Sequence, residues 1–103
     1  MTERKTHIVK SWTYLFQAIL AGIKFHDVRD MREREYKKGD YMILREFDMS
    51  RGEYTGRWAK VEITYITDKQ VPCAFSSAVL DRDFGILSVK MLESGDEFAS
   101  LGL

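Results

Sequence analysis

Hydrophobic and polar positions follow two different periods along the chain, and each period predicts its own kind of element. After Ser11, apolar residues recur at intervals of three and four, as on one buried face of a helix: Trp12, Leu15, Phe16, Ile19, Leu20 and Ile23. Ser11 suits the N-cap position, and Gly22 can adopt the left-handed conformation that ends a helix. The pattern predicts a helix over residues 12–21 that buries most of Trp12, Phe16, Ile19 and Leu20.

A period of two predicts strands elsewhere in the chain. It is clearest where apolar Ala59, Val61 and Ile63 alternate with charged or polar neighbours. Segments of similar character predict strands at residues 5–10, 25–30, 41–48, 57–67 and 85–92. Residues 49–56 contain two glycines and a serine, which favours a hairpin loop, and residues 76–84 form a short helix or a loop.

These elements together predict an α+β fold. About five to six strands, one main helix and hairpin-type connections suggest a small closed or nearly closed β-barrel with the helix packed against it. A chain of 103 residues is long enough for one such domain. We expect the domain to span residues 1–92 and residues 93–103 to form a loosely packed or frayed C-terminal tail.

Charge is balanced overall but unevenly distributed. The net charge is zero, yet residues 1–38 carry nine Lys and Arg against five Asp and Glu, and residues 81–103 carry two against five. Any contact with nucleic acid must therefore come from a local patch. Apolar runs are too short to cross a bilayer, the N-terminus lacks the apolar core of a secretory signal, and Cys73 has no cysteine partner. We expect a cytoplasmic protein that has no membrane partner.

Motifs for common cofactors are missing from the sequence. Neither GxGxxG nor GxxxxGK[ST] occurs, and His7, His26 and Cys73 are too few and too scattered to suggest a zinc site. No Ser–His–Asp arrangement with a nucleophile elbow can be identified. We therefore expect neither a cofactor nor a metal.

The stretch GIKFHDVRD places several ionisable groups directly after the predicted helix end. In an extended segment, Asp27 and Arg29 share one face and are close enough to form an ion pair. Lys24 lies at the corner between helix and strand. Such a group can bind an anion or the polar edge of a base, and a desolvated lysine can act as a base or nucleophile. A solvated surface strand with one structural salt bridge is the alternative.

Two further places carry candidate chemistry. Arg45 and Glu46 lie on opposite faces of the predicted strand 41–48, so one of them can point into the barrel mouth, unless both face solvent. The stretch SRGEYTGR contributes Arg51, Tyr54 and Arg57. Tyrosine between arginines can stack on bases and bind phosphates of single-stranded RNA, although anchoring of the loop on the core is the more common role of such a tyrosine.

The sequence resembles the ASCH superfamily, whose fold is similar to the PUA domains of RNA-modification proteins. The family signature Gly-x-Lys-x-x-Glu-x-Arg matches Gly22, Lys24 and Arg29, with Asp27 in the acidic position. Small phage and bacterial ASCH/PUA-like proteins of unknown function are the most similar subgroup. Their features recur here in order between about residues 7 and 92: HIVKSW, AGIKFHDVRD, YKKGDYMILREFD, GEYTGR, VEITYI and GILSVKML.

The resemblance implies a PUA-like module that binds RNA or a nucleotide in a polar cleft. Residues expected to contact the ligand are Lys24, Asp27, Arg29, Arg45, Glu46, Tyr54 and Arg57. One ASCH branch is an amidohydrolase acting on acetylated cytidine through a Lys, a Thr and a Glu. Lys24 matches that Lys, Asp27 stands in the Thr position, and the helical insertion carrying the Glu has no counterpart here. The alternatives are therefore such a hydrolase, with Lys24 and Asp27 as catalytic residues, or an interaction factor that binds a host protein.

Overall fold

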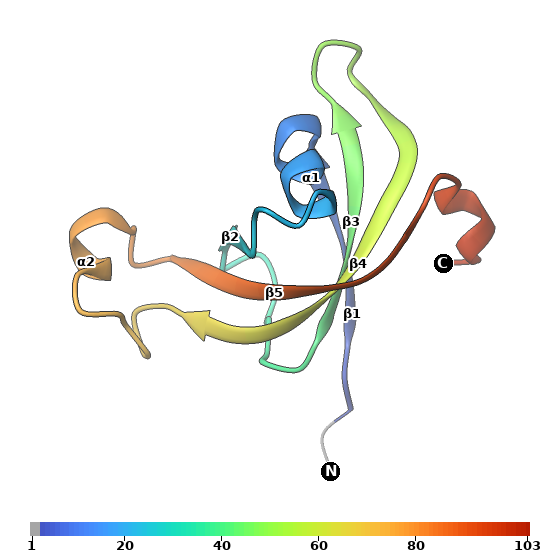
Figure 1. Ribbon diagram of the computed structural model, residues 1–103. Helices are drawn as coiled ribbons and strands as arrows, with labels where there is room; N and C mark the ends of the chain where they lie inside the picture. Colours follow the sequence, from blue (N-terminus) through green and yellow to red (C-terminus); the bar gives the residue numbers. More distant parts are fainter. Residues whose placement is uncertain (1–2) are drawn as a thin grey trace.

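The computed structural model describes residues 3–103, and its five strands form a single sheet in the order β1-β3-β4-β5-β2 (Figure 1). Strands β1 and β3 are parallel, whereas the β3–β4, β4–β5 and β5–β2 pairs are antiparallel. The elements in chain order are β1 Thr6–Trp12, α1 Thr13–Leu20, β2 His26–Asp30, β3 Tyr41–Asp48, β4 Glu53–Thr67, α2 Ser76–Val79, β5 Phe84–Gly95 and the 3-10 helix η1 Phe98–Leu101.

The sheet curls into a half-barrel. This confirms a small barrel-like α+β fold with one main helix, but the barrel is more open than predicted. Strands β1 and β2 are the two edges of the sheet and do not pair with each other. A fully closed barrel has a continuous ladder of backbone hydrogen bonds between its strands. This sheet instead has a gap between β1 and β2, which we call the seam, and side chains bridge it.

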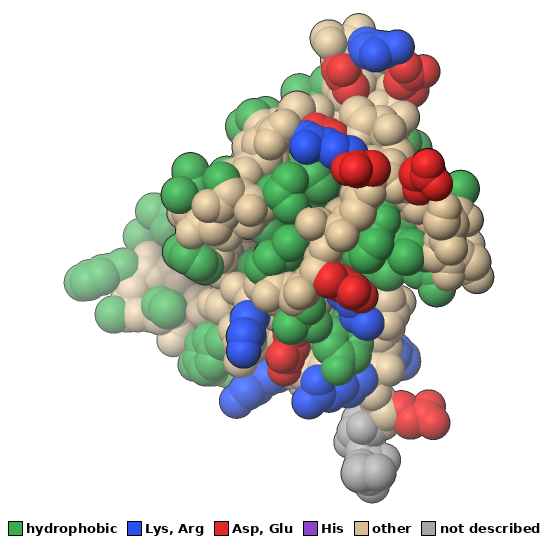
Figure 2. Space-filling model, turned by 45° about the vertical axis from the view of Figure 1, so that its right-hand side comes forward, with side chains coloured by type: hydrophobic (Ala, Val, Ile, Leu, Met, Phe, Trp, Pro, Cys, Tyr) green, Lys and Arg blue, Asp and Glu red, His purple; other side chains and the backbone are tan. Residues whose placement is uncertain are grey.

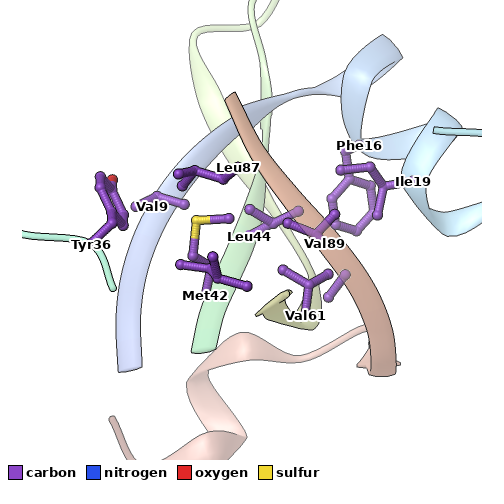
Figure 3. Packing of buried hydrophobic residues seen from close by; sticks show 11 residues of the cluster. Val9, Phe16, Ile19, Tyr36, Met42, Leu44, Val61, Leu87 and Val89 are labelled. Atoms are coloured by element: carbon purple, nitrogen blue, oxygen red, sulfur yellow. The ribbon is translucent and has the colours of Figure 1, made fainter. Parts of the chain in front are cut away.

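Helix α1 packs on the inner side of the curved sheet, against β1, β3 and β5. Its fully buried residues, Phe16 and Ile19, point into the core, as Figure 3 shows. The core cluster comprises Val9, Phe16, Ile19, Tyr36, Met42, Leu44, Ala59, Val61, Ile63, Leu87 and Val89. Because the alternating positions of the strands supply most of this cluster, the period-two pattern correctly marks the inner face of the sheet.

The start and end of the predicted helix need correction. Trp12 has extended backbone angles, ends β1 and keeps 44% of its surface exposed, so the prediction that it belongs to the helix and is mostly buried is wrong. Ser11 is a buried residue of β1 rather than the N-cap. At the other end Gly22 adopts φ 76°, as predicted, and the chain leaves the helix before Ile23, which is 77% exposed. The helical spacing of apolar residues therefore extends by chance beyond both ends of the helix, to Trp12 and Ile23.

The strand boundaries also differ from the predicted ones. Strand β3 matches the prediction, but β4 begins at Glu53, so Tyr54 lies in a strand rather than in the hairpin loop. Strand β5 continues to Gly95, beyond the predicted end at residue 92. Gly95 allows a close approach, because a Cβ atom there would lie 2.7 Å from the Trp58 indole nitrogen.

The C-terminal segment covers part of the outer face of the sheet, by which we mean the face opposite the core cluster. A small pocket on this face is lined by residues of the sheet and of the segment: Thr6, Ile43, Trp58, Lys60, Glu93, Leu101 and Leu103. Figure 2 shows this side of the molecule, where hydrophobic side chains are interspersed with charged ones. Within residues 3–103, no helix has the length and apolar character needed to cross a membrane.

Candidate functional site

A cleft of about 270 Å³ opens at the seam, where the end of β1, the start of α1 and β2 meet. Its lining residues are Lys10, Ser11, Trp12, Leu15, Asp27, Val28 and Arg29. Two of the three residues predicted from the GIKFHDVRD stretch, Asp27 and Arg29, thus lie in one cleft. The cleft combines an aromatic side chain with cationic groups, a composition suited to a small polar ligand that has a planar part.

Asp27 and Arg29 form the ion pair that the extended spacing predicts. The Arg29 Nε–H donates to Asp27 Oδ2 at 2.6 Å, and Asp27 is buried. The Nη2 group of Arg29 donates to the backbone carbonyl of Lys10 at 2.8 Å. Arg29 therefore connects the two edges of the sheet, while its Nη1 group makes no hydrogen bond with any residue between 3 and 103. A guanidinium held in this way presents its remaining N–H groups in a fixed direction.

Lys24 lies outside this cleft. Its Nζ donates to the backbone carbonyl of His26, two residues along the chain. Of the three side chains predicted to act together, the structure brings together only Asp27 and Arg29. The reason is that β2 begins after Lys24, so the alternation of side chains along the strand does not align the lysine with Asp27.

A second polar cluster joins Glu46, Thr55 and Arg57 at the end of β3 and the start of β4. Arg57 donates from Nε and Nη2 to the two Glu46 oxygens at 2.7 and 3.0 Å, and the Thr55 hydroxyl donates to Glu46 Oε1 at 2.7 Å. The Arg57 hydrogen bonds hold the pKa of the buried Glu46 below its usual value. Glu46 is thus the member of the Arg45–Glu46 pair that points inward. Its charge is already matched by Arg57, so this cluster supports the hairpin.

Arg45 points to the outer face of the sheet, where aromatic rings enclose it. Its guanidinium carbon lies 3.9 Å from the ring centre of Tyr54 and 3.9 Å from that of Phe98. Arg45 Nε is buried and makes no hydrogen bond within residues 3–103. Arg45 and Tyr54 therefore contact each other, as stacking candidates should, but neither of them lines the seam cleft. Arg51 instead pairs with Glu53 at 3.0 Å on the exposed hairpin.

A buried network that the sequence analysis missed lies on the inner side of β1. His7 Nε2 and Asp40 Oδ2 are 2.8 Å apart, and the Asp40 carboxylate also accepts the backbone N–H groups of Lys5 and Lys37. Tyr36 packs on the His7 ring at 4.7 Å, and burial raises the pKa of its hydroxyl. The network fixes the turn before β3 to β1. Its residues are far apart in the sequence, so spacing gives no signal for it.

Lys10 and Trp12 are the other cleft residues that the sequence analysis did not select. Both have exposed side chains on alternate positions of β1. The spacing of Lys10 and Trp12, two positions apart, is the signal that the sequence contained for a shared face of a strand. Assigning Trp12 to the helix concealed it.

The described part of the chain, residues 3–103, contains no group of three or more His, Cys, Asp or Glu side chains that could hold a metal ion. Comparison with curated proteins gave no match to this chain. The model of one protein family, described as a domain of unknown function (DUF3850), matches residues 6–89, which include β1 to β4, the first half of β5 and both edges of the seam. The chain therefore belongs to the DUF3850 family.

Proposed function

We propose that this protein is an RNA- or nucleotide-binding module of the PUA-like, ASCH type, and that the seam cleft is its ligand site. The observation that carries the proposal is the Arg29 guanidinium, oriented by the Asp27 carboxylate and the Lys10 carbonyl at the wall of the cleft. The resemblance of residues 7–92 to ASCH proteins supports the same assignment. A reducing, cytoplasmic location fits a chain with a single cysteine.

The chemistry of the cleft favours a nucleotide unit over other polar ligands. Arg29 can donate the N–H groups that its hydrogen bonds to Asp27 and Lys10 leave free, those of Nη1 above all, to a phosphate or to the edge of a base. Trp12 offers an aromatic face on which a base can stack, and Lys10 supplies a second positive charge beside it. The volume of about 270 Å³ suits a single planar group rather than a large ligand.

Binding is better supported than amide hydrolysis. The Asp27 carboxylate is engaged by Arg29, and the Lys24 amino group is engaged by a backbone carbonyl away from the cleft. A general base must lie within hydrogen-bonding reach of the proton that it removes. In this arrangement the ligand would meet Arg29, Lys10 and Trp12, none of which is the lysine that the hydrolase branch uses.

A titration with labelled single-stranded RNA and with a mononucleotide, at two salt concentrations, tests the proposal. Arg29→Ala should weaken binding by about 1–3 kcal/mol, the range for a lost charged hydrogen bond. Arg29→Lys keeps the charge but not the planar fork, so it should restore only part of the affinity. Since Arg29 also bridges the seam, thermal unfolding of each variant must accompany the titration.

Arg82→Ala is the matched control, because Arg82 is an exposed arginine outside the seam cleft. It should leave the affinity for both ligands close to that of the wild type. Equal affinities for the wild-type, Arg29→Ala and Arg82→Ala proteins would contradict the proposed site. Absence of binding to both ligands in the wild type would contradict the proposed function itself.

A further inference from the structure

The outer face of β1, β3 and β4 carries two neighbouring rows of side chains, of which only the members on β1 line the seam cleft. Strand register places Trp12 beside Phe47 and Phe47 beside Tyr54, which makes an aromatic row across the three strands. The next row has Lys10 beside Arg45. Directly paired residues on one face of a sheet are close neighbours. An aromatic row therefore lies next to a cationic row.

Contacts between the two rows show that they form one surface. The Phe47 and Tyr54 rings meet edge to face, with their centres 5.1 Å apart. The Lys10 ammonium lies 4.1 Å from the centre of the Phe47 ring, and Arg45 stacks on Tyr54 at 3.9 Å. Each cation thus keeps an aromatic residue of the neighbouring row in place. We call these five residues, Lys10, Trp12, Arg45, Phe47 and Tyr54, the aromatic–cationic surface.

The ends of the aromatic row are open to solvent. Trp12 is 44% exposed and Tyr54 is 40% exposed. Beyond Trp12, the ring of Tyr14 lies with its centre 6.4 Å from the indole and is itself exposed. Large aromatic side chains are costly to leave in water, and three of them occur here beside two cations. The exposed aromatic rings and the neighbouring cations therefore suit a ligand that has planar apolar parts and negative charge.

The surface is continuous with the seam cleft. Lys10 and Trp12 belong to the surface and also line the cleft beside Arg29. A ligand that enters the cleft with one unit can therefore continue over β3 and β4 with its next units. A mononucleotide is too small to do so, whereas a strand of several nucleotides is long enough.

We propose that the aromatic–cationic surface binds single-stranded RNA that extends out of the seam cleft. Bases stack on Trp12 and Tyr54, and Lys10 lies beside the backbone phosphates, while Arg45, enclosed between the Tyr54 and Phe98 rings, holds Tyr54 in place. Stacking platforms combined with cations are the usual means of binding a single strand, whereas a duplex keeps its bases stacked inside and unavailable. The inference rests on the proposed function and makes the ligand a strand rather than a free nucleotide.

Fluorescence titration with a labelled ten-nucleotide single-stranded RNA of mixed sequence, the same RNA as a duplex, and a mononucleotide tests the inference. Tyr54→Ala should weaken binding of the single strand by about tenfold or more, as loss of one stacking platform does. It should leave mononucleotide binding unchanged, since Tyr54 does not line the cleft. If Tyr54→Ala does not fold, Tyr54→Leu replaces it, because leucine keeps an apolar side chain over Arg45. Tyr54→Leu should weaken binding of the single strand to a similar extent.

Two matched controls lie on the same sheet. Tyr65 is a 45% exposed tyrosine at the other end of β4, and Tyr65→Ala should not change the affinity for any of the three probes. Lys10→Ala should reduce the salt dependence of single-strand binding, because one cation near phosphate is lost. Lys90→Ala, which removes an exposed lysine of β5, should leave that salt dependence as it is.

The outcomes separate this inference from the proposed function. If Arg29→Ala weakens binding but Tyr54→Ala and Tyr54→Leu bind the single strand as tightly as Tyr65→Ala does, the seam cleft is supported as the ligand site. The aromatic–cationic surface is then contradicted. Equal affinity for the duplex and the single strand overturns the inference in the same way. If the wild-type protein binds none of the three probes, the proposed function and the inference both fail.

Discussion

At the scale of single residues, the best-defined interaction is the buried Glu46 carboxylate held by both nitrogen donors of Arg57. Arg57→Ala should lower the free energy of unfolding by about 2–3 kcal/mol, because it leaves a charged buried group with few partners. Chemical denaturation of the wild type and the variant measures the difference.

Arg51→Ala is the control for that measurement. Arg51 also pairs with a glutamate, Glu53, but both side chains are more than half exposed. Exposed pairs contribute little, so the loss should stay within about 1 kcal/mol. Equal losses for Arg51→Ala and Arg57→Ala would show that burial of Glu46 does not matter. Replacing Glu46 and Arg57 together with apolar residues should cost less than Arg57→Ala alone.

At the scale of elements, α1 depends on one short buried face. It is an eight-residue helix without a side-chain N-cap, so its stability must come from packing rather than from the isolated helix. Phe16 is fully buried under the sheet, and Arg57 lies 5.2 Å from its ring centre. Phe16→Ala should lower the free energy of unfolding by about 3–5 kcal/mol, as expected for an aromatic core residue.

Tyr14→Ala provides the comparison within the same helix. Tyr14 is exposed, so its replacement should change the free energy of unfolding by about 0.5 kcal/mol or less. Thermal or urea unfolding of both variants tests the pair. A small effect of Phe16→Ala would mean that α1 is not packed on the half-barrel as described.

At the scale of the whole molecule, acid should destabilise the fold. Burial raises the pKa of Asp40, but hydrogen bonds from His7 and from the backbone N–H groups of Lys5 and Lys37 outweigh it, so the pKa is below its usual value. Hydrogen bonds from Arg57 likewise lower the pKa of Glu46. A carboxylate with a lowered pKa stabilises the folded state above its unfolded pKa and loses that contribution as the pH falls. Unfolding measured from pH 7 to pH 3 should show the loss beginning below about pH 5.

Asp40→Asn identifies the carboxylate responsible. The variant should be less stable than the wild type at pH 7 and should lose less stability between pH 7 and pH 3, because its amide does not titrate. Glu93→Gln, at an exposed position, should keep the wild-type pH profile. An Asp40→Asn profile parallel to that of the wild type would rule out Asp40 as a cause of the acid sensitivity.

In the whole molecule, the seam leaves an accessible cleft on one side of the sheet. Strands β1 and β2 remain unpaired edges, so Arg29 can bridge them while Lys10 and Trp12 stay accessible beside it. In a closed barrel the ladder hydrogen bonds would occupy the Lys10 carbonyl. The candidate site therefore exists because the sheet stops at five strands.

The sequence by itself determined the local elements. Helical and strand periods located α1, β3 and the inner face of β4, and the spacing of Asp27 and Arg29 predicted their ion pair. These features depend on residues within about one turn or two strand positions of each other. Side-chain direction at that range follows from backbone geometry alone.

Only the tertiary structure decided which strands pair and what each candidate residue contacts. The parallel pairing of β1 with β3 sets Trp12 beside Phe47 on the outer face, although the periodicity had assigned Trp12 to the helix. Glu46 meets Arg57, and His7 meets Asp40, across the sheet or across a turn. Such contacts are set by strand order and register, which depend on how the whole apolar surface is buried, and no short segment contains that information.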